Sequence, residues 1–184
     1  MAFGYQVLGF GSGVAAGDAT APEVAWLGDR GVYCGAATNQ AIDVIEYIKI
    51  SSAGNSTDFG NMTAGRYAGG ACSNGTRLCY GGGFDYSVVS YNVIQYLTIA
   101  STGNMSDFGD LTVSRTYLGS AAANATIGMW MGGHDGISSS LNTVDKVNIA
   151  STGNASDFGD LSAARYNCGA TSNGTRAFCC GGDS

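Results

Sequence analysis

The sequence predicts an all-β fold made of small repeated sheets, and two observations lead to this prediction. The motif Ser-Asp-Phe-Gly-Asp-Leu occurs at residues 106–111 and 156–161, and a near copy, Thr-Asp-Phe-Gly-Asn-Met, occurs at residues 57–62. The three copies are spaced by 49 and 50 residues. The chain of 184 residues also contains 30 glycines. A glycine inside a helix costs roughly 1 kcal/mol relative to alanine, so short strands and tight turns are expected instead of long helices.

Each repeat contains four segments with strand character. In the repeat that begins at Arg66, residues 69–73 and 76–80 flank an Asn-Gly turn, which is a strong hairpin signal between β-prone runs. Residues 93–99 alternate as a third strand that is apolar on both faces, and residues 107–111 form a short fourth strand. Four short strands in about 50 residues are typical of one blade of a β-propeller.

The same four-part pattern divides the whole chain. We expect a glycine-rich arm or strand at residues 1–18 and propeller repeats at residues 19–184. The expected blades span residues 24–62, 63–111 and 112–161, with a partial blade at residues 162–184 and with strands of the first blade at 24–27, 31–35 and 44–50.

About three and a half blades per chain raise the question of ring closure, because closed propellers have roughly four to eight blades. In one closure, residues 5–10 pair beside residues 177–180 and complete a four-bladed ring. In the other, two chains combine their blades in one ring. Either closure removes exposed sheet edges. We favour the second and expect a homo-oligomer, because a ring of four thin blades has a small core.

The order of residues in the repeat resembles a kelch repeat over about residues 24–184. The shared features are an arginine, small residues with glycine, Asn-Gly-Thr-Arg, an apolar run, Gly-Gly, a loop, a hydrophobic strand and an aromatic residue before the next arginine. The sequence departs from kelch where Phe59, Phe108 and Phe158 replace an expected tryptophan. The Gly/Asn-rich style and the opening at residues 1–11 also resemble virion proteins of tailed phages, particularly marine ones. These resemblances imply a kelch-like β-propeller located in a virion.

Charge and hydropathy exclude two classes of partner. The net charge is -6, 12% of the residues are charged and the pI is about 4.4, so a nucleic-acid backbone would be repelled. No run of about 20 apolar residues is present and residues 1–14 lack the features of a secretory signal, so neither membrane insertion nor a removable leader is expected.

The charged residues that recur in the repeat are interpreted as structural. Arginines and aspartates at constant offsets predict ion pairs and turn-capping hydrogen bonds within or between blades. The Asp-Phe-Gly motif matches the magnesium motif of protein kinases, but no other kinase motif accompanies it. Seven Asn-x-Ser/Thr sequons recur at the turns, where turn chemistry explains them better than glycosylation does. The repeat-structural residues are Asp58, Phe59, Arg66, Asp107, Phe108, Arg115, Asp157, Phe158 and Arg165.

No catalytic, cofactor or metal site is predicted. The single histidine, His134, cannot build a catalytic triad or the copper site of kelch-like oxidases, and no Cys-x-x-Cys motif supports zinc. Gly9, Gly11 and Gly13 are not followed by the helix that a phosphate loop requires. Calcium in an Asp/Asn-rich loop stays open as an alternative. Most of the six cysteines are expected to be buried free thiols: Cys34, Cys72, Cys79, Cys168, Cys179 and Cys180.

Loops of variable length between the second and third strands are the expected recognition surface. They span residues 36–43, 84–92 and 134–143, and the candidate recognition residues are Phe84, Asp85, Tyr86, His134 and Asp135. The resulting hypothesis is a non-enzymatic virion protein, a decoration, tail or fibre component. It would mediate assembly with other virion proteins or adhesion to the host surface, with residues 1–14 as a docking arm. The alternative is a lectin-like module whose aromatic faces bind a host-surface glycan.

Overall fold

The computed structural model describes residues 29–37, 40–85, 87, 90–118 and 121–184. These residues form thirteen strands in four antiparallel sheets and contain no helix, so the all-β prediction is confirmed. The expected strand at residues 24–27 and the arm at residues 1–18 lie outside the described residues.

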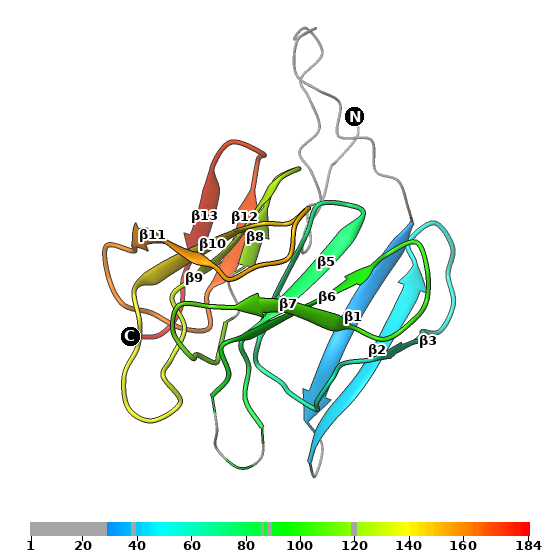
Figure 1. Ribbon diagram of the computed structural model, residues 1–184, viewed down its shortest axis with the longest axis horizontal. Helices are drawn as coiled ribbons and strands as arrows, with labels where there is room; N and C mark the ends of the chain where they lie inside the picture. Colours follow the sequence, from blue (N-terminus) through cyan, green and yellow to red (C-terminus); the bar gives the residue numbers. More distant parts are fainter. Residues whose placement is uncertain (1–28, 38–39, 86, 88–89, 119–120) are drawn as a thin grey trace, which may run out of the picture.

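Each sheet is formed by strands that are consecutive in the chain. Sheet 1 has the order β1 (Arg30–Ala37), β2 (Ala41–Lys49), β3 (Thr57–Asn61). Sheet 2 has the order β4 (Gly70–Ser73), β5 (Arg77–Gly81), β6 (Val93–Thr98), β7 (Ser106–Asp110), and sheet 3 the order β8 (Ala121–Ala123), β9 (Ile127–Met131), β10 (Thr143–Asn148), β11 (Ser156–Asp160). Sheet 4 contains β12 (Gly169–Ser172) and β13 (Ala177–Cys180). The sheets follow one another across the molecule, and β12 and β13 lie on the opposite side from β2 and β3 (Figure 1).

The turn of the first hairpin in a repeat contains an asparagine. Its side chain makes hydrogen bonds to the backbone of the turn. The side-chain Oδ1 atom of Asn74 accepts hydrogen bonds from the backbone N–H groups of Thr76 at 3.2 Å and Arg77 at 2.9 Å. Its Nδ2 atom donates to the carbonyl of Ala125 in the next hairpin turn, at 3.2 Å. Asn124 and Asn173 accept the corresponding turn bonds. These sequon asparagines therefore serve turn geometry, as the sequence predicts.

The Asp-Phe-Gly segment forms the outermost strand of sheets 1, 2 and 3, and in each copy a β-bulge leaves the phenylalanine without a partner in the register. In sheet 2 the register shifts between Ile94 and Gln95, next to Gly109. Gly109 has a φ of 145°, and a Cβ atom there would lie 2.5 Å from the backbone of Gly153 in the following sheet. Because no side chain fits this approach, the glycine of the motif is needed for the contact between consecutive sheets.

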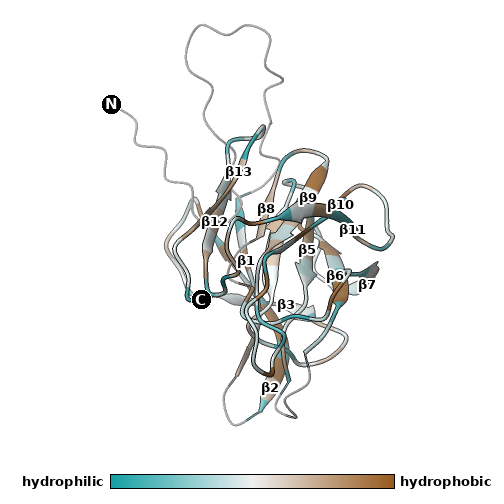
Figure 2. Cartoon of the chain, turned by 90° about the vertical axis from the view of Figure 1, so that its left-hand side faces the viewer, coloured by the Kyte–Doolittle hydropathy of each residue, from teal (hydrophilic) through white to brown (hydrophobic). Residues whose placement is uncertain are grey.

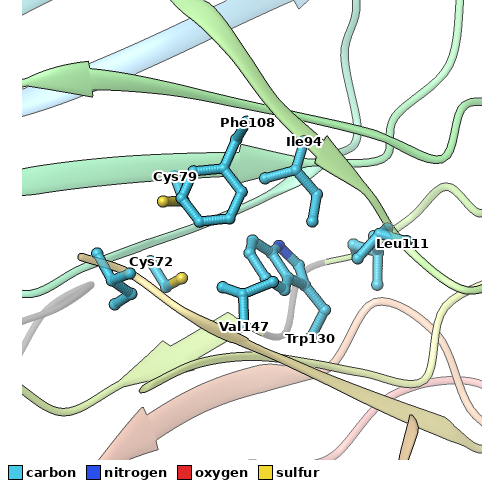
Figure 3. Close-up of a cluster of buried hydrophobic side chains, with 9 residues drawn as sticks. Cys72, Cys79, Ile94, Phe108, Leu111, Trp130 and Val147 are labelled. Atoms are coloured by element: carbon cyan, nitrogen blue, oxygen red, sulfur yellow. The ribbon is translucent and has the colours of Figure 1, made fainter. Parts of the chain in front are cut away.

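The hydrophobic core consists of three clusters, one between each pair of consecutive sheets. Between sheets 2 and 3, the Trp130 indole is fully buried and lies among Ile94, Phe108 and Val147 (Figure 3). Its Nε1–H group donates to the carbonyl of Gly70 at 2.9 Å, so the one polar atom of the ring is satisfied. Hydrophobic stretches of β2, β6 and β9 stand out along the chain (Figure 2). Both faces of sheets 2 and 3 are thus covered, as their apolar third strands predict.

The three phenylalanines of the repeated motif are not equally buried. Phe59 and Phe108 are each 2% exposed, whereas Phe158 is 58% exposed. The second and third strands of the following sheet, with the segment after the third strand, cover the first two rings. Sheet 4 contains only its first two strands in the described part of the chain, so Phe158 lacks this cover.

Candidate functional site

The recurring arginines join the second and third strands of a sheet at its loop-bearing end. The side chain of Arg115 is fully buried, and its Nη1 atom donates to the carbonyls of Gly132 at 2.9 Å and Thr143 at 2.7 Å. Arg66 makes the equivalent bonds to Gly82 at 3.1 Å and Val93 at 3.2 Å. These bonds hold the two ends of the variable loop together, so the arginine sets the base of each loop.

The Arg115 guanidinium also forms a buried ion pair. Its Nη2 atom lies 2.5 Å from the Asp145 carboxylate, and both side chains have no exposed surface. Thr112 donates to the same carboxylate from its backbone N–H at 3.0 Å and from its hydroxyl at 2.6 Å. Burial lowers the pKa of Arg115, and the Asp145 charge opposes this shift. Arginine keeps its charge even so, and the paired carboxylate compensates it.

The expected pairing of the recurring arginines with Asp58, Asp107 and Asp157 is wrong. These three carboxylates are exposed, and no ion pair within the described ranges includes them. The Asp157 carboxylate instead accepts the N–H of Gly159 at 3.0 Å, across the bulge of its own strand. The true partner, Asp145, lies on the third strand, where Glu46 and Gln95 occupy the corresponding register positions. A polar residue at the same place in three apolar strands was the signal that the sequence analysis missed.

A row of aromatic rings lies at the end of the sheets that carries these arginines. Tyr67 and Phe84 meet edge to face at 5.4 Å, and Phe84 lies 6.1 Å from Tyr117. Tyr117 lies 5.9 Å from Tyr166, and the His134 ring lies 5.2 Å from Tyr166. The row therefore continues from sheet 2 to the segment before sheet 4, and Tyr67, Tyr117, His134 and Tyr166 are each only partly buried.

Side-chain hydrogen bonds connect the loops at residues 84–92 and 134–143, which lie next to the aromatic row. Asp85 accepts a hydrogen bond from the Tyr91 hydroxyl at 2.8 Å, which raises the pKa of Tyr91. The Ser90 hydroxyl donates to the backbone carbonyl of Asp135 at 2.7 Å and so links the loop of sheet 2 to the loop of sheet 3. The described parts of the two loops are therefore in contact.

Asp135 serves the geometry of its own loop. Its Oδ1 atom accepts the N–H groups of Ser139, Ile137 and Ser138 at 3.0, 2.8 and 2.9 Å. These three bonds lower the pKa of Asp135 to about 2. Nδ1 of His134 accepts the N–H of Gly136 at 3.0 Å and lies 3.4 Å from the Asp135 carboxylate, so both side chains contribute to the geometry of this loop.

The predicted recognition residues therefore have different positions in the structure. Phe84 is buried inside the aromatic row, Asp85 and Asp135 shape the loops, His134 is part of the row, and Tyr86 lies outside the described residues. Among the described large hydrophobic residues, Ile137 is the most exposed, at 86%. It was not predicted from the sequence, although an aliphatic residue between Gly136 and a run of serines is unusual for a loop.

The described residues contain no cluster of three or more histidine, cysteine and acidic side chains that could bind a metal ion. Their cysteines are free thiols, and Cys72 and Cys79 face each other in the register of β4 and β5. Burial raises the pKa of Cys79 to about 12 and that of Cys72 well above its ordinary value. Within the described ranges, no helix is long and apolar enough to cross a membrane.

Comparison with known proteins assigns no family to this chain. No protein-family model matches the sequence. No curated protein matches it either.

Proposed function

We propose that the four sheets are blades of a kelch-like β-propeller, with about three and a half blades in each chain. Three features support this proposal. The described strands of each sheet follow in chain order, and each sheet packs on the next one. Arg66, Arg115 and Arg165 bond to equivalent glycine carbonyls. The loops between the second and third strands of sheets 2 and 3 touch each other. These features are what the kelch resemblance implies for a repeat of this length.

We propose that the chain is a non-enzymatic structural protein of a phage particle and that its loop-bearing end adheres to a host surface or to other virion proteins. The observation that supports adhesion is the row of partly buried aromatic rings beneath two linked loops. Rings held in one orientation provide contact area at a low cost in conformational entropy. The virion assignment rests on the resemblance of residues 1–11 and of the repeats to tailed-phage proteins.

The virion assignment is tested by mass spectrometry of purified particles of the phage that encodes this chain. Peptides from this chain should occur at a constant ratio to the major capsid protein through successive purification steps. If they separate from the particles in a density gradient, the chain is not a virion component.

Competition with phage adsorption tests the adhesive end. Purified protein should reduce adsorption of the phage to its host, and Ile137→Asp should weaken that inhibition by about tenfold, because it places a charge at the tip of the contact surface. Ala100→Asp is a control for the added charge, since Ala100 is exposed in the turn after β6, at the end of sheet 2 away from the loops. Equal inhibition by the two variants would argue against the proposed end.

A lectin-like module is the second candidate, because partly exposed Tyr117 and Tyr166 could stack on the apolar face of a sugar ring. On a glycan array, this function predicts selective binding that Tyr166→Ala reduces by about tenfold. Thr102→Ala is the control, because Thr102 is exposed in the turn between β6 and β7, at the other end of sheet 2. An array without any bound glycan would leave only the adhesive role that depends on protein contacts.

A further inference from the structure

Two cysteines face each other in the first hairpin of sheet 2. Cys72 on β4 lies directly opposite Cys79 on β5, and both side chains belong to the buried cluster between sheets 2 and 3. Leu78 and Tyr80, the neighbours of Cys79 on β5, belong to the cluster on the other face of the sheet. Both sulfur atoms are visible in the interface with sheet 3 (Figure 3). The two thiols therefore lie beside each other on one face of the hairpin.

The backbone geometry of this pair suits a disulfide bond. The backbone N–H of Asn74 donates to the carbonyl of Arg77, so Arg77 and, two residues later, Cys79 direct their backbone groups toward β4. Cys72 and Cys79 thus form the hydrogen-bonded type of antiparallel pair, in which the Cα atoms are about 5.5 Å apart. Disulfides join residues whose Cα atoms are roughly 4.4–6.8 Å apart. The two sulfur atoms can therefore be joined without a change of register.

The same position of the hairpin is occupied differently in the following sheets. The corresponding pair is Ala122 and Met129 in sheet 3, and Thr171 and Phe178 in sheet 4. Each of these pairs combines a small side chain with a large one. Among the described sheets, two thiols meet at this position in sheet 2 alone. The packing that the repeats share therefore does not account for the second cysteine.

We propose that Cys72 and Cys79 form a reversible disulfide when the chain folds in the presence of a disulfide oxidant such as oxidised glutathione. The thiolate of one cysteine attacks the glutathione disulfide, forms a mixed disulfide and releases one reduced glutathione. The thiolate of the other cysteine attacks the protein sulfur of that mixed disulfide, which closes the bond and releases a second reduced glutathione. The two protein thiols are thereby oxidised, and one glutathione disulfide is reduced to two thiols.

Burial determines when this exchange takes place. Cys72 is 3% exposed and Cys79 is fully buried, and burial raises the pKa of both thiols, so the folded protein contains little reactive thiolate. The bond therefore forms while the hairpin is unfolded or open, and the folded sheets then enclose it and protect it from reductants. It links the first two strands of sheet 2 covalently. This inference does not depend on the proposed function of the chain.

Peptide mapping after refolding tests the proposal on the full chain. Trypsin cleaves after Arg77 and so separates Cys72, in peptide 67–77, from Cys79, in peptide 78–115. After refolding from urea with oxidised glutathione, a digest without reductant should contain these two peptides as one linked species. Its mass should be that of the pair less two hydrogen atoms, and reduction should separate the peptides. Any other pairing gives a different mass, because the remaining cysteines lie in the tryptic peptides 31–49, 166–176 and 177–184.

Cys72→Ala is the matched control, because alanine occupies the equivalent position, Ala122, in sheet 3. Refolding of the native sequence with oxidised glutathione, compared with refolding in reductant, should lower the equilibrium constant for unfolding in urea about tenfold, because the bond restricts the unfolded chain. Cys72→Ala should show no such difference. Absence of the linked species while exposed Cys180 carries glutathione would overturn the proposal. So would a linked protein that does not regain the tryptophan fluorescence of the reduced protein, because the bond would then be incompatible with the fold.

Discussion

The Arg115–Asp145 pair is the most consequential single contact of the described residues, because both charges are completely buried. Removing one member leaves the other without compensation in a medium of low polarity. We expect Arg115→Met to lower the free energy of unfolding by about 3–5 kcal/mol, measured by urea denaturation followed through tryptophan fluorescence.

Adding Asp145→Asn to Arg115→Met should recover part of that loss, because the second change removes the uncompensated carboxylate. Lys49→Met, at an exposed residue, should change stability by less than about 0.5 kcal/mol. A loss for Arg115→Met as small as that of the Lys49 variant would show that the pair contributes little.

The cysteines should differ in reactivity according to burial. Cys72 and Cys79 are buried with raised pKa values, whereas Cys180 is exposed. Because the thiolate is the reactive form, a disulfide reagent at pH 8 should modify Cys180 promptly and reach Cys72 and Cys79 only when the protein unfolds. Cys180→Ser serves as the control and should remove the fast phase. Prompt modification of Cys72 or Cys79 would contradict the packing between sheets 2 and 3.

The stability of the loop around Asp135 should depend on pH in the acidic range. Three backbone hydrogen bonds lower the pKa of Asp135 from 3.8 to about 2, so the folded loop favours the ionised carboxylate. This stabilisation is complete above about pH 4 and is lost as the pH falls toward 2. NMR should show the amide signals of Ile137, Ser138 and Ser139 shifting in that range. Asp135→Asn should remove most of the shift, and a titration at the ordinary aspartate pKa would contradict the observed hydrogen bonds.

At the scale of single elements, the Gly-Gly corner after the second strand depends on the absence of a side chain. Gly82 has a φ of 67°, and a Cβ atom there would lie 2.5 Å from the carbonyl oxygen of Arg115 in the connection to the next sheet. Gly174 also has a positive φ, of 88°, but a Cβ atom there would meet no neighbouring atom. A side chain at Gly174 would therefore cause backbone strain alone, whereas one at Gly82 would cause backbone strain and a steric clash.

We expect Gly174→Ala to cost about 1–2 kcal/mol, from backbone strain alone. Gly82→Ala should cost roughly 3 kcal/mol or more, because the new methyl group also displaces the carbonyl of Arg115. Thermal and urea unfolding of both variants would measure the difference. Equal losses would mean that the connection between the sheets can move without a significant cost.

The strands themselves were predicted more accurately than their side-chain contacts. The Asn-Gly turn, the Gly-Gly corner and the alternation of residues 93–99 are local signals, and each strand of sheet 2 lies within two residues of its expected range. The partner of Arg115 was predicted incorrectly because ion pairing depends on which face of a strand points inward. A β-bulge at Phe108 and Phe158 alters the alternation of the Asp-Phe-Gly strand, and its position is not evident from spacing.

At the scale of the whole molecule, apolar side chains are exposed in the first and last of the described sheets at positions where the equivalent side chains between sheets are buried. Tyr33 of sheet 1 is 64% exposed, although the equivalent ring of Tyr80 is 4% exposed in sheet 2. Exposed aromatic side chains of this kind are typical of surfaces that associate, and the homo-oligomer stays a prediction.

Size-exclusion chromatography with light scattering should therefore give a mass that is a multiple of 18.6 kDa. Tyr33→Ser and Phe158→Ser should each lower that mass toward the single chain, because each removes an apolar contact at one end. Tyr166→Ser lies in the aromatic row and serves as the control. A mass of 18.6 kDa at high protein concentration would contradict the oligomer and favour closure within one chain.

The sequence by itself determined the repeat, the all-β class and the positions of most turns, because these depend on residues close together in the chain. Only the tertiary structure decided that Arg115 pairs with Asp145, that rings from successive repeats form one row, and that Phe158 differs from Phe59 and Phe108. These features bring together residues that lie far apart in the sequence, many of them in different repeats. The three copies of Asp-Phe-Gly are nearly identical in sequence, and what distinguishes them physically is the sheet that follows each one.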